Sequence, residues 1–311
     1  MSARKRVAVV GSGTSGMGAL YALQHTQHEL HLFEANERLG GHAHIVLVER
    51  DGLEVGCDFA FVGFNPVIYL LTGPSSEEYL NPTEPDAKLE TIDEYLYRNC
   101  HSIRFRDDYL VPMTDLLWST SPNKVRRDFP TNTLVWFLWN HHLLINVAKG
   151  YDWLSIQGGT AKYVDAIVRG LPTENVHIGT SVTCGTVLLE LANGNVESFD
   201  HAVHGPQALK MISPQLTQQG IETLGAFKPH RKEVVLHADT DHMPKDRSMW
   251  SCWNYKAESD TEGFDKASVT AWLNLVMEIP EKRFGPILVT VDPQEPPRED
   301  LVYGSFDFDH P

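Results

Sequence analysis

The feature that most constrains the fold of this chain is a buried strand followed at once by three regularly spaced glycines. Residues 7–10, V-A-V-V, are apolar without interruption, which predicts a strand covered on both faces. Gly11, Gly13 and Gly16 follow with G-x-G-x-x-G spacing and open a segment with helical periodicity, 17–24. In a βαβ unit such glycines permit a tight turn, close approach of a pyrophosphate and close packing of helix on strand. The amino end of the helix then attracts phosphate charge.

A second strand and a second glycine turn extend this pattern. Residues 29–33 predict a strand that ends at Glu34, whose carboxylate can accept both hydroxyls of an adenosine ribose and disfavours a 2′-phosphate. The run R-L-G-G-H, 38–42, then places a glycine turn at the carboxyl end of a strand. Such a turn is typical of flavoproteins, because the longer flavin dinucleotide continues past the first turn. A glycine-rich turn that binds nothing is the alternative interpretation.

Composition excludes several classes of partner. The 311 residues include 26 Lys and Arg and 41 Asp and Glu, which gives a net charge of −15. This charge disfavours binding to nucleic acid and to anionic membranes. The N-terminus is polar, and the longest apolar run, 134–138, is too short to span a bilayer. The four cysteines form no C-x-x-C motif, which is typical of free thiols in a reducing compartment. We therefore expect a cytoplasmic protein without a transmembrane segment.

The rest of the chain predicts two interleaved domains. Asp51-Gly52 predicts a hairpin turn, and 66–91 reads as a surface loop. Helices are expected at 92–102, 105–117 (interrupted by Pro112), 132–148, 161–169, 207–212 and 214–224. Strands are expected at 43–49, 53–57, 176–178, 199–203, 232–238, 250–256, 268–276 and, as the last clear one, 286–291, with a further hairpin around Asn193-Gly194. Residues 151–160 read as a strand-like run that ends in a glycine turn.

This order of elements predicts an α/β protein with a parallel-sheet domain and a second, mixed α+β substrate domain. The two glycine turns indicate that the parallel-sheet domain is a Rossmann-like FAD/NAD(P)-binding domain. The first domain is predicted to comprise 1–65 and 155–225, and the second 66–154 and 226–311. The aromatic segment 132–148 is more typical of a core than of a binding wall. If one face lines a pocket, however, it favours a large apolar ligand.

Several longer motifs resemble those of the flavin-containing amine oxidase superfamily, in particular its branch of predicted NAD/FAD-binding oxidoreductases. They are G-S-G-T-S-G, F-E-A-N-E-R-L-G-G-H-A-H, L-V-P-M-T-D-L-L-W-S-T, D-F-P, Q-G-G-T-A-K-Y-V and W-S-C-W-N-Y. The resemblance implies a two-domain flavoprotein with FAD extended along the first domain. By position, the resemblance implies that the pyrophosphate is contacted by Gly11, Gly13, Ser15 and Gly16, and the adenosine ribose by Glu34. It implies that the pyrophosphate–ribityl region is flanked by Arg38, Gly40, Gly41 and His42, and that the adenine is contacted by the backbone of Val182.

The chain departs from the family pattern in the half that would hold the flavin ring. Ala60 replaces the glycine of the D-x-G-F element that begins at Asp58, and family members are longer before the helical region. The strand 199–203 passes directly to His204 without the small-residue turn of the family. The sequence ends at Pro311, before the family's C-terminal glycine–alanine motif. These departures predict a site that recognises ADP-like groups and holds an isoalloxazine poorly.

Three residues are candidates for catalysis: Tyr255, His44 and Asp58. Tyr255 shares a strand face with Trp253 and could donate a proton, although ordinary sheet packing also explains the pair. Asp58 could orient a base or cap its loop. His42-x-His44 could bind a metal together with a distant histidine, but hydrogen-bonded histidines beside a phosphate site are favoured, so no metal site is predicted.

Two functions of different classes follow, with a third that is non-catalytic. The first is a FAD-dependent oxidoreductase acting on an apolar, unsaturated or polycyclic small molecule. The second is a former flavoprotein that has lost redox chemistry and works as an isomerase or cyclase on a hydrophobic substrate, using acid/base residues. The third is a binding protein on the same scaffold. The sequence predicts neither the substrate nor the oligomeric state.

Overall fold

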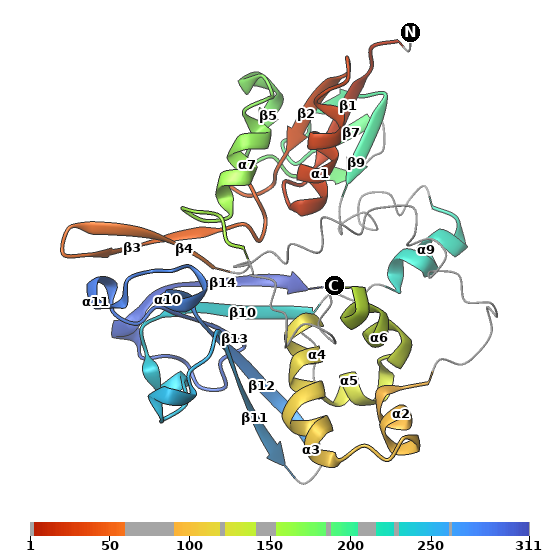
Figure 1. The fold of residues 1–311 in the computed structure, drawn as a ribbon. Helices are drawn as coiled ribbons and strands as arrows, with labels where there is room; N and C mark the ends of the chain where they lie inside the picture. The colour runs from red at the N-terminus through yellow and green to blue at the C-terminus, as the bar shows by residue number, and fades with distance from the viewer. Residues whose placement is uncertain are drawn as a thin grey trace. The chain divides into compact units, whose positions relative to one another are not determined.

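The computed structural model describes two compact units, and each contains its own sheet (Figure 1). Unit 1 comprises 1–61, 156–230 and 311, and unit 2 comprises 62–155 and 231–310. The described residues are 3–59, 90–118, 122–140, 154–184, 188–204, 216–226, 230–260 and 263–310.

The centre of unit 1 is a four-stranded parallel sheet in the order β5-β2-β1-β9. Its strands are β1 (Arg6–Val10), β2 (Glu29–Phe33), β5 (Val176–His177) and β9 (His201–His204). Helices α1 (Thr14–Leu23) and α7 (Ala161–Val168) contribute Met17, Leu20 and Val164 to a core that includes Val7 and Val9 of β1. This confirms the predicted α/β fold class and the predicted first strand, helix and second strand.

The other face of this sheet is covered by a small antiparallel sheet. Its strands are β6 (Val182–Cys184), β7 (Leu188–Leu191) and β8 (Val196–Ser198). Leu189 and Leu191 of β7 pack with Ala8 of β1 and Phe33 of β2. Because neighbouring residues of β1 point to opposite faces, this packing explains why 7–10 is apolar without interruption.

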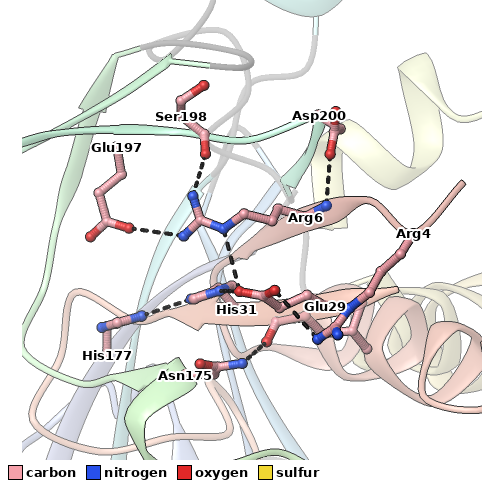
Figure 2. Close-up of polar contacts among 10 residues, drawn as sticks. Arg4, Arg6, Glu29, His31, Asn175, His177, Glu197, Ser198 and Asp200 are labelled. Carbon is pink, nitrogen blue, oxygen red and sulfur yellow. Dashed lines mark hydrogen bonds and ion pairs between the residues drawn. The ribbon is translucent and has the colours of Figure 1, made fainter. Parts of the chain in front are cut away.

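A network of polar contacts fixes the amino ends of the parallel strands (Figure 2). The Arg6 backbone N–H donates to Asp200 Oδ2 at 2.7 Å, and Arg6 Nη1 donates to the Ser198 carbonyl at 2.6 Å. Glu29 Oε1 lies 3.4 Å from Arg6 Nε and 3.0 Å from His31 Nε2. The chain before β9 is thereby tied to the start of β1, at the end of the sheet opposite to the glycine turns.

A hairpin, two turns and a helix complete the described part of unit 1. β3 (Ile45–Arg50) and β4 (Leu53–Asp58) form a hairpin whose turn residues, Asp51 and Gly52, have φ values of +52° and +73°, as the Asp-Gly pair predicts. The Asn193-Gly194 turn joins β7 to β8. A 3₁₀ turn, Thr173–Asn175, and helix α9 (Gln218–Gly225) are the remaining elements.

Unit 2 combines a five-stranded sheet with a group of helices (Figure 1). The sheet order is β11-β12-β13-β10-β14, with bounds Trp253–Asp260, Gly263–Trp272, Leu288–Val291, His230–His237 and Val302–His310. The helices are α2 (Ile92–Arg98), α3 (Ile103–Phe105), a π-helical segment (Arg106–Leu110), α4 (Val111–Trp118), α5 (Pro122–Asp128), α6 (Thr131–Asn140), α10 (Leu273–Val276) and α11 (Glu281–Phe284), with 3₁₀ turns at Thr240–His242, Arg247–Met249 and Glu299–Leu301. Buried residues of α2, α4, α5 and α6 form one core with Leu110.

Several predictions about unit 2 were wrong. Pro112 does not interrupt the helix, because the wider π-helical turn that precedes it accommodates a residue without an N–H. Residues 286–291 do not contain the last strand, since β14 follows at the edge of the sheet. Residues 273–276 belong to α10 rather than to a strand.

Other predictions fall partly outside the described residues. Helix α6 is described as far as Asn140, and 141–150 lie outside the described ranges, as do 207–212 and residues 66–89 of the predicted surface loop. Phe137 packs against the helical core and against Trp118, which is the core interpretation of the aromatic segment. Of the strand-like run 151–160, the described part, 154–160, forms no strand, but the glycine turn predicted at its end is present, with φ values of +82° at Gly158 and +91° at Gly159.

Candidate functional site

The first glycine turn has the geometry of a phosphate-binding turn. Gly11 follows β1 with φ +92°, and its N–H donates to the Phe33 carbonyl at 2.8 Å. A Cβ added at Gly16 would lie 1.9 Å from the Gly11 carbonyl oxygen, so only glycine lets α1 pack this close to β1. A Cβ at Gly11 or Gly13 would meet nothing within 4 Å, so open space lies beside both residues.

The amino end of α1 is suited to hold an anion. Its N-cap residue is Gly13, and neither a side-chain cap nor an acidic residue in the first turn is present among the described residues. The N–H groups of the first turn therefore point toward the open space with the positive end of the helix dipole behind them. This is the arrangement that binds diphosphates in dinucleotide-binding folds.

The second glycine turn packs directly against the first. Gly40 and Gly41 have φ values of +103° and +56°, and a Cβ at Gly41 would lie 2.9 Å from Gly13 Cα. The buried Ser12 hydroxyl accepts a hydrogen bond from Gly40 N–H at 2.9 Å and donates to Glu34 Oε2 at 2.5 Å. Ser12 therefore connects both turns to the acid at the end of β2, a role that the sequence pattern did not reveal.

Glu34 lies where a ribose-binding acid is expected, and its carboxylate is well supplied with donors. Oε2 accepts from Ser12 N and Oγ, while Oε1 accepts from the backbone and side-chain nitrogens of Asn36 at 2.9 and 2.8 Å. Burial by itself raises the pKa of Glu34, but these hydrogen bonds outweigh it and hold the pKa below its ordinary value. The side chain is therefore an anion at neutral pH, with only 6% of its surface exposed.

The chain around Val182 runs beside this acid. Thr180 N–H donates to the Glu34 carbonyl at 2.7 Å, and Gly179 N–H donates to the Asn36 carbonyl at 3.0 Å. Val182 follows two residues later at the start of β6 and packs against the core that contains Phe33. The structure thus brings the predicted adenine-contacting segment to the predicted ribose acid.

Four of the predicted residues flank the two turns in different ways. Arg38 Nη1 donates to the Gly41 carbonyl at 2.8 Å, and burial lowers the pKa of this guanidinium. Ser15 and His42 are exposed. His44 is half-buried near Phe59, with ring centroids 5.6 Å apart, and burial together with the Arg38 charge lowers its pKa, which favours the neutral imidazole.

Asp58 makes the contacts of a helix cap. Its Oδ1 accepts from the backbone N–H of Thr160 at 2.7 Å and from the Thr160 hydroxyl at 2.6 Å, directly before α7 begins at Ala161. Asp58 is fully buried, and burial raises its pKa although both hydrogen bonds act against the rise. These contacts match the loop-capping interpretation, with the additional feature that the capped element is a helix.

Tyr255 forms a partly buried acid–phenol pair in unit 2 with Asp115, a residue that the sequence pattern did not reveal. Its hydroxyl donates to Asp115 Oδ2 at 3.0 Å, and the two residues are 140 positions apart. Burial raises the pKa of Asp115 to about 6, and burial together with the Asp115 charge raises the pKa of Tyr255. An acid that titrates near neutrality can accept or donate a proton under physiological conditions.

The structure therefore gathers the predicted cofactor-binding residues in unit 1, whereas Tyr255 belongs to unit 2. Within the described ranges, no group of three metal-ligating side chains lies close enough to hold a metal ion. Across the same residues, no helix has the length and apolar character needed to cross a membrane. The residues of unit 1 fit an adenosine diphosphate, since an open glycine turn, an uncapped helix end and an anionic ribose acid lie together. These features are those of a Rossmann-like α/β domain.

Comparison with known proteins supports this class. Residues 9–69 match the NAD(P)-binding Rossmann-like domain. A segment of 48 residues is 46% identical to the L-amino acid oxidase of Cerastes cerastes and, equally, to that of Pseudechis australis. That segment covers 15% of this chain and only 9% of the length of either relative.

Solved structures share the fold over nearly the whole chain. Cyclohexylamine oxidase from Brevibacterium oxydans aligns with a TM-score of 0.60 at 14% identity, over 99% of this chain and 85% of that one. Reduced UDP-galactopyranose mutase aligns with a TM-score of 0.56 at 14% identity, over 99% and 82%. An oxidoreductase from Methanosarcina mazei aligns with a TM-score of 0.55 at 11% identity, over 98% and 88%. The predicted resemblance to the amine oxidase superfamily is thus confirmed at the level of the fold.

Proposed function

We propose that this protein is a FAD-dependent oxidoreductase that holds the adenosine diphosphate half of FAD at the glycine turns of unit 1. The observation that carries the proposal is the open space beside Gly11 and Gly13 at the uncapped end of α1, next to the anionic Glu34. The N–H groups of the α1 first turn would bind the diphosphate, and Glu34 would bind the ribose. The resemblance to flavin-containing amine oxidases favours FAD over a nicotinamide dinucleotide.

The residues around the turns would orient the cofactor. Arg38 would contribute positive charge beside the second turn, where it already contacts the Gly41 carbonyl. The segment that leads from Thr180 to Val182 would contact the adenine from the side of Glu34. Bound FAD would supply hydride acceptance from the substrate, and the protein would supply binding and orientation.

The substrate that we propose is a small apolar molecule, unsaturated or polycyclic. The proposal is supported by the acid–phenol pair of unit 2, whereas Phe137 of the aromatic segment 132–148 belongs to the helical core. Asp115 would hold or release a proton at neutral pH, and Tyr255 would donate its hydroxyl hydrogen to Asp115 or to a substrate oxygen or nitrogen. The scattered cysteines support a reducing compartment such as the cytoplasm.

A second candidate function, a cofactor-independent isomerase or cyclase, is favoured by the same acid–phenol pair. Proton transfer between two carbon or oxygen positions needs a group that can both accept and return a proton, but no electron acceptor. Asp115, whose pKa burial raises to about 6, could do this near neutrality, while Tyr255, whose pKa is raised, stays protonated as its hydrogen-bond donor. Ala60 in place of the family glycine and the direct passage of the strand 199–203 to His204 also favour this second candidate.

Spectroscopy and titration calorimetry on the purified protein test the proposal. We expect flavin absorbance after reconstitution with FAD, together with calorimetric binding of ADP. Gly13→Asp should abolish both, because it places a carboxylate beside the diphosphate position while its Cβ meets nothing within 4 Å. Gly18→Asp is the matched control, since it lies in the same helix and also has open space beside it.

The outcomes separate the candidates. ADP binding without flavin absorbance, with turnover that Tyr255→Phe abolishes, would favour the isomerase or cyclase. Absence of both ADP binding and flavin binding would refute the proposed nucleotide site. Equal ADP binding by Gly13→Asp and Gly18→Asp would refute its location at α1.

A further inference from the structure

The four donors that surround the Glu34 carboxylate differ in how firmly they are held. Two are backbone N–H groups, of Ser12 and Asn36, whose positions are set by the chain. The third is the Ser12 hydroxyl, which is fully buried and also accepts from Gly40 N–H. The fourth is the side-chain amide of Asn36, an exposed residue, which donates to Oε1 at 2.8 Å.

These four donors already fill the carboxylate. A carboxylate offers about four lone-pair positions, and each Glu34 oxygen accepts two hydrogen bonds from the chain itself. A ribose hydroxyl that donates to Glu34 must therefore displace one of these donors. The Asn36 amide is the donor that can leave most easily, because water can solvate it in its new position.

We propose that Asn36 gates the ribose acid: its side-chain amide occupies an acceptor position on Glu34 Oε1 that a ribose hydroxyl needs, so the protein competes with its own nucleotide. This inference rests on the proposed nucleotide site and adds a residue that determines its affinity. The amide keeps the buried carboxylate satisfied when no nucleotide is bound. The same amide lowers the affinity for any ligand that brings its own hydroxyl.

The proposal predicts that a truncating substitution strengthens binding, which is the opposite of what loss of a structural contact predicts. Asn36→Ala keeps the backbone N–H on Oε1 and removes only the competing amide. An intramolecular hydrogen bond is worth a modest amount relative to water, so we expect ADP to bind about three- to tenfold more tightly. The gain requires a ribose hydroxyl, and 2′,3′-dideoxy-ADP should therefore gain nothing.

Isothermal titration calorimetry tests the proposal with two ligands, ADP and 2′,3′-dideoxy-ADP. Each ligand is titrated into the wild type and into Asn36→Ala, and the four affinities are compared. Asn193→Ala is the matched control, because Asn193 is an exposed turn asparagine of the same unit that bonds its own turn, and it should leave both affinities unchanged. Tighter ADP binding by Asn36→Ala that vanishes with the dideoxy ligand supports the gate.

The contrary outcomes are distinct from one another. If wild type binds ADP and Asn36→Ala binds it equally or more weakly, Asn36 supports the site rather than competing for it, and the gate is refuted while the nucleotide site stands. An equal gain for both ligands also refutes the gate. If neither protein binds ADP, the proposed nucleotide site fails, and the gate fails with it.

Discussion

The contact between α1 and β1 makes a sharp prediction about Gly16. In Gly16→Ala, the new Cβ would lie 1.9 Å from the Gly11 carbonyl oxygen, 3.0 Å from its carbon and 3.4 Å from Val9 Cγ1. The first distance is 1.1 Å below the 3.0 Å that real Cβ contacts keep, and the obstacle is backbone. The helix must therefore move away from the strand, which opens the buried packing of Met17 and Leu20.

The magnitude follows from two opposing terms. Overpacking of this kind costs about 1–3 kcal/mol, and alanine in place of a helical glycine returns about 0.5–1 kcal/mol. Gly18→Ala in the same helix should gain only the stabilisation that alanine gives to a helix, because its Cβ meets nothing within 4 Å. The two variants should therefore differ in the free energy of unfolding by about 1–3 kcal/mol.

Urea unfolding followed by circular dichroism measures this difference. With a slope of about 2 kcal/mol per molar urea, the midpoints of Gly16→Ala and Gly18→Ala should lie about 1 M apart. The displaced helix end should also weaken ADP binding by Gly16→Ala and leave that of Gly18→Ala intact. If both variants unfold at the same urea concentration, the helix does not depend on close approach to the strand, and the argument from Gly16 is wrong.

Three further predictions concern the buried polar groups. Ser12→Ala leaves the buried Gly40 N–H without its acceptor and should cost about 1–3 kcal/mol in urea unfolding, whereas the exposed Ser15→Ala should cost nothing measurable. Burial raises the pKa of Asp115 in the folded protein from 3.8 to about 6, so its contribution to the free energy of unfolding is present below pH 3.8 and is lost as the pH rises toward 6. Asp115→Asn should remove this loss, which amounts to up to about 3 kcal/mol. An unchanged dependence of stability on pH in this variant would contradict the prediction. Burial lowers the folded pKa of His237 from 6.5 to about 4, so its contribution is present above pH 6.5 and is lost as pH falls toward 4; His237→Gln, which keeps a donor for Thr290, should flatten the acid limb in the same assay.

Much of unit 1 could be predicted because its determinants are local. The apolar run before Gly11 specifies a doubly covered strand, and the positive φ angles at Gly11, Gly40 and Gly52 occur where glycine-containing motifs indicated turns. The Asp51-Gly52 pair fixed a hairpin for the same reason. Each of these features depends on neighbours within a few residues, so the sequence pattern carries them.

The features that escaped prediction depend on distant contacts. Asp115 gains its chemistry only because a tyrosine 140 positions away lies beside it. The edge strand β14 has the apolar–acidic alternation of a half-exposed strand, F-D-F-D, but Asp has a low strand propensity, and the place of β14 is set by pairing with β10. Ser12 and Asn36 are part of the sequence motifs, but their roles could not be predicted, because these depend on both side chains donating to Glu34 in the fold.

The order in which the parallel strands are assembled has a consequence for synthesis on the ribosome. β1 pairs with β9 from Val7 to His201, so nearly two hundred residues must emerge before β1 has a neighbouring strand on both sides. Until then, the nascent chain exposes one edge of its most apolar strand. High contact order of this kind slows folding, and chaperones that cover exposed strand edges should associate with translating ribosomes until β9 has left the exit tunnel.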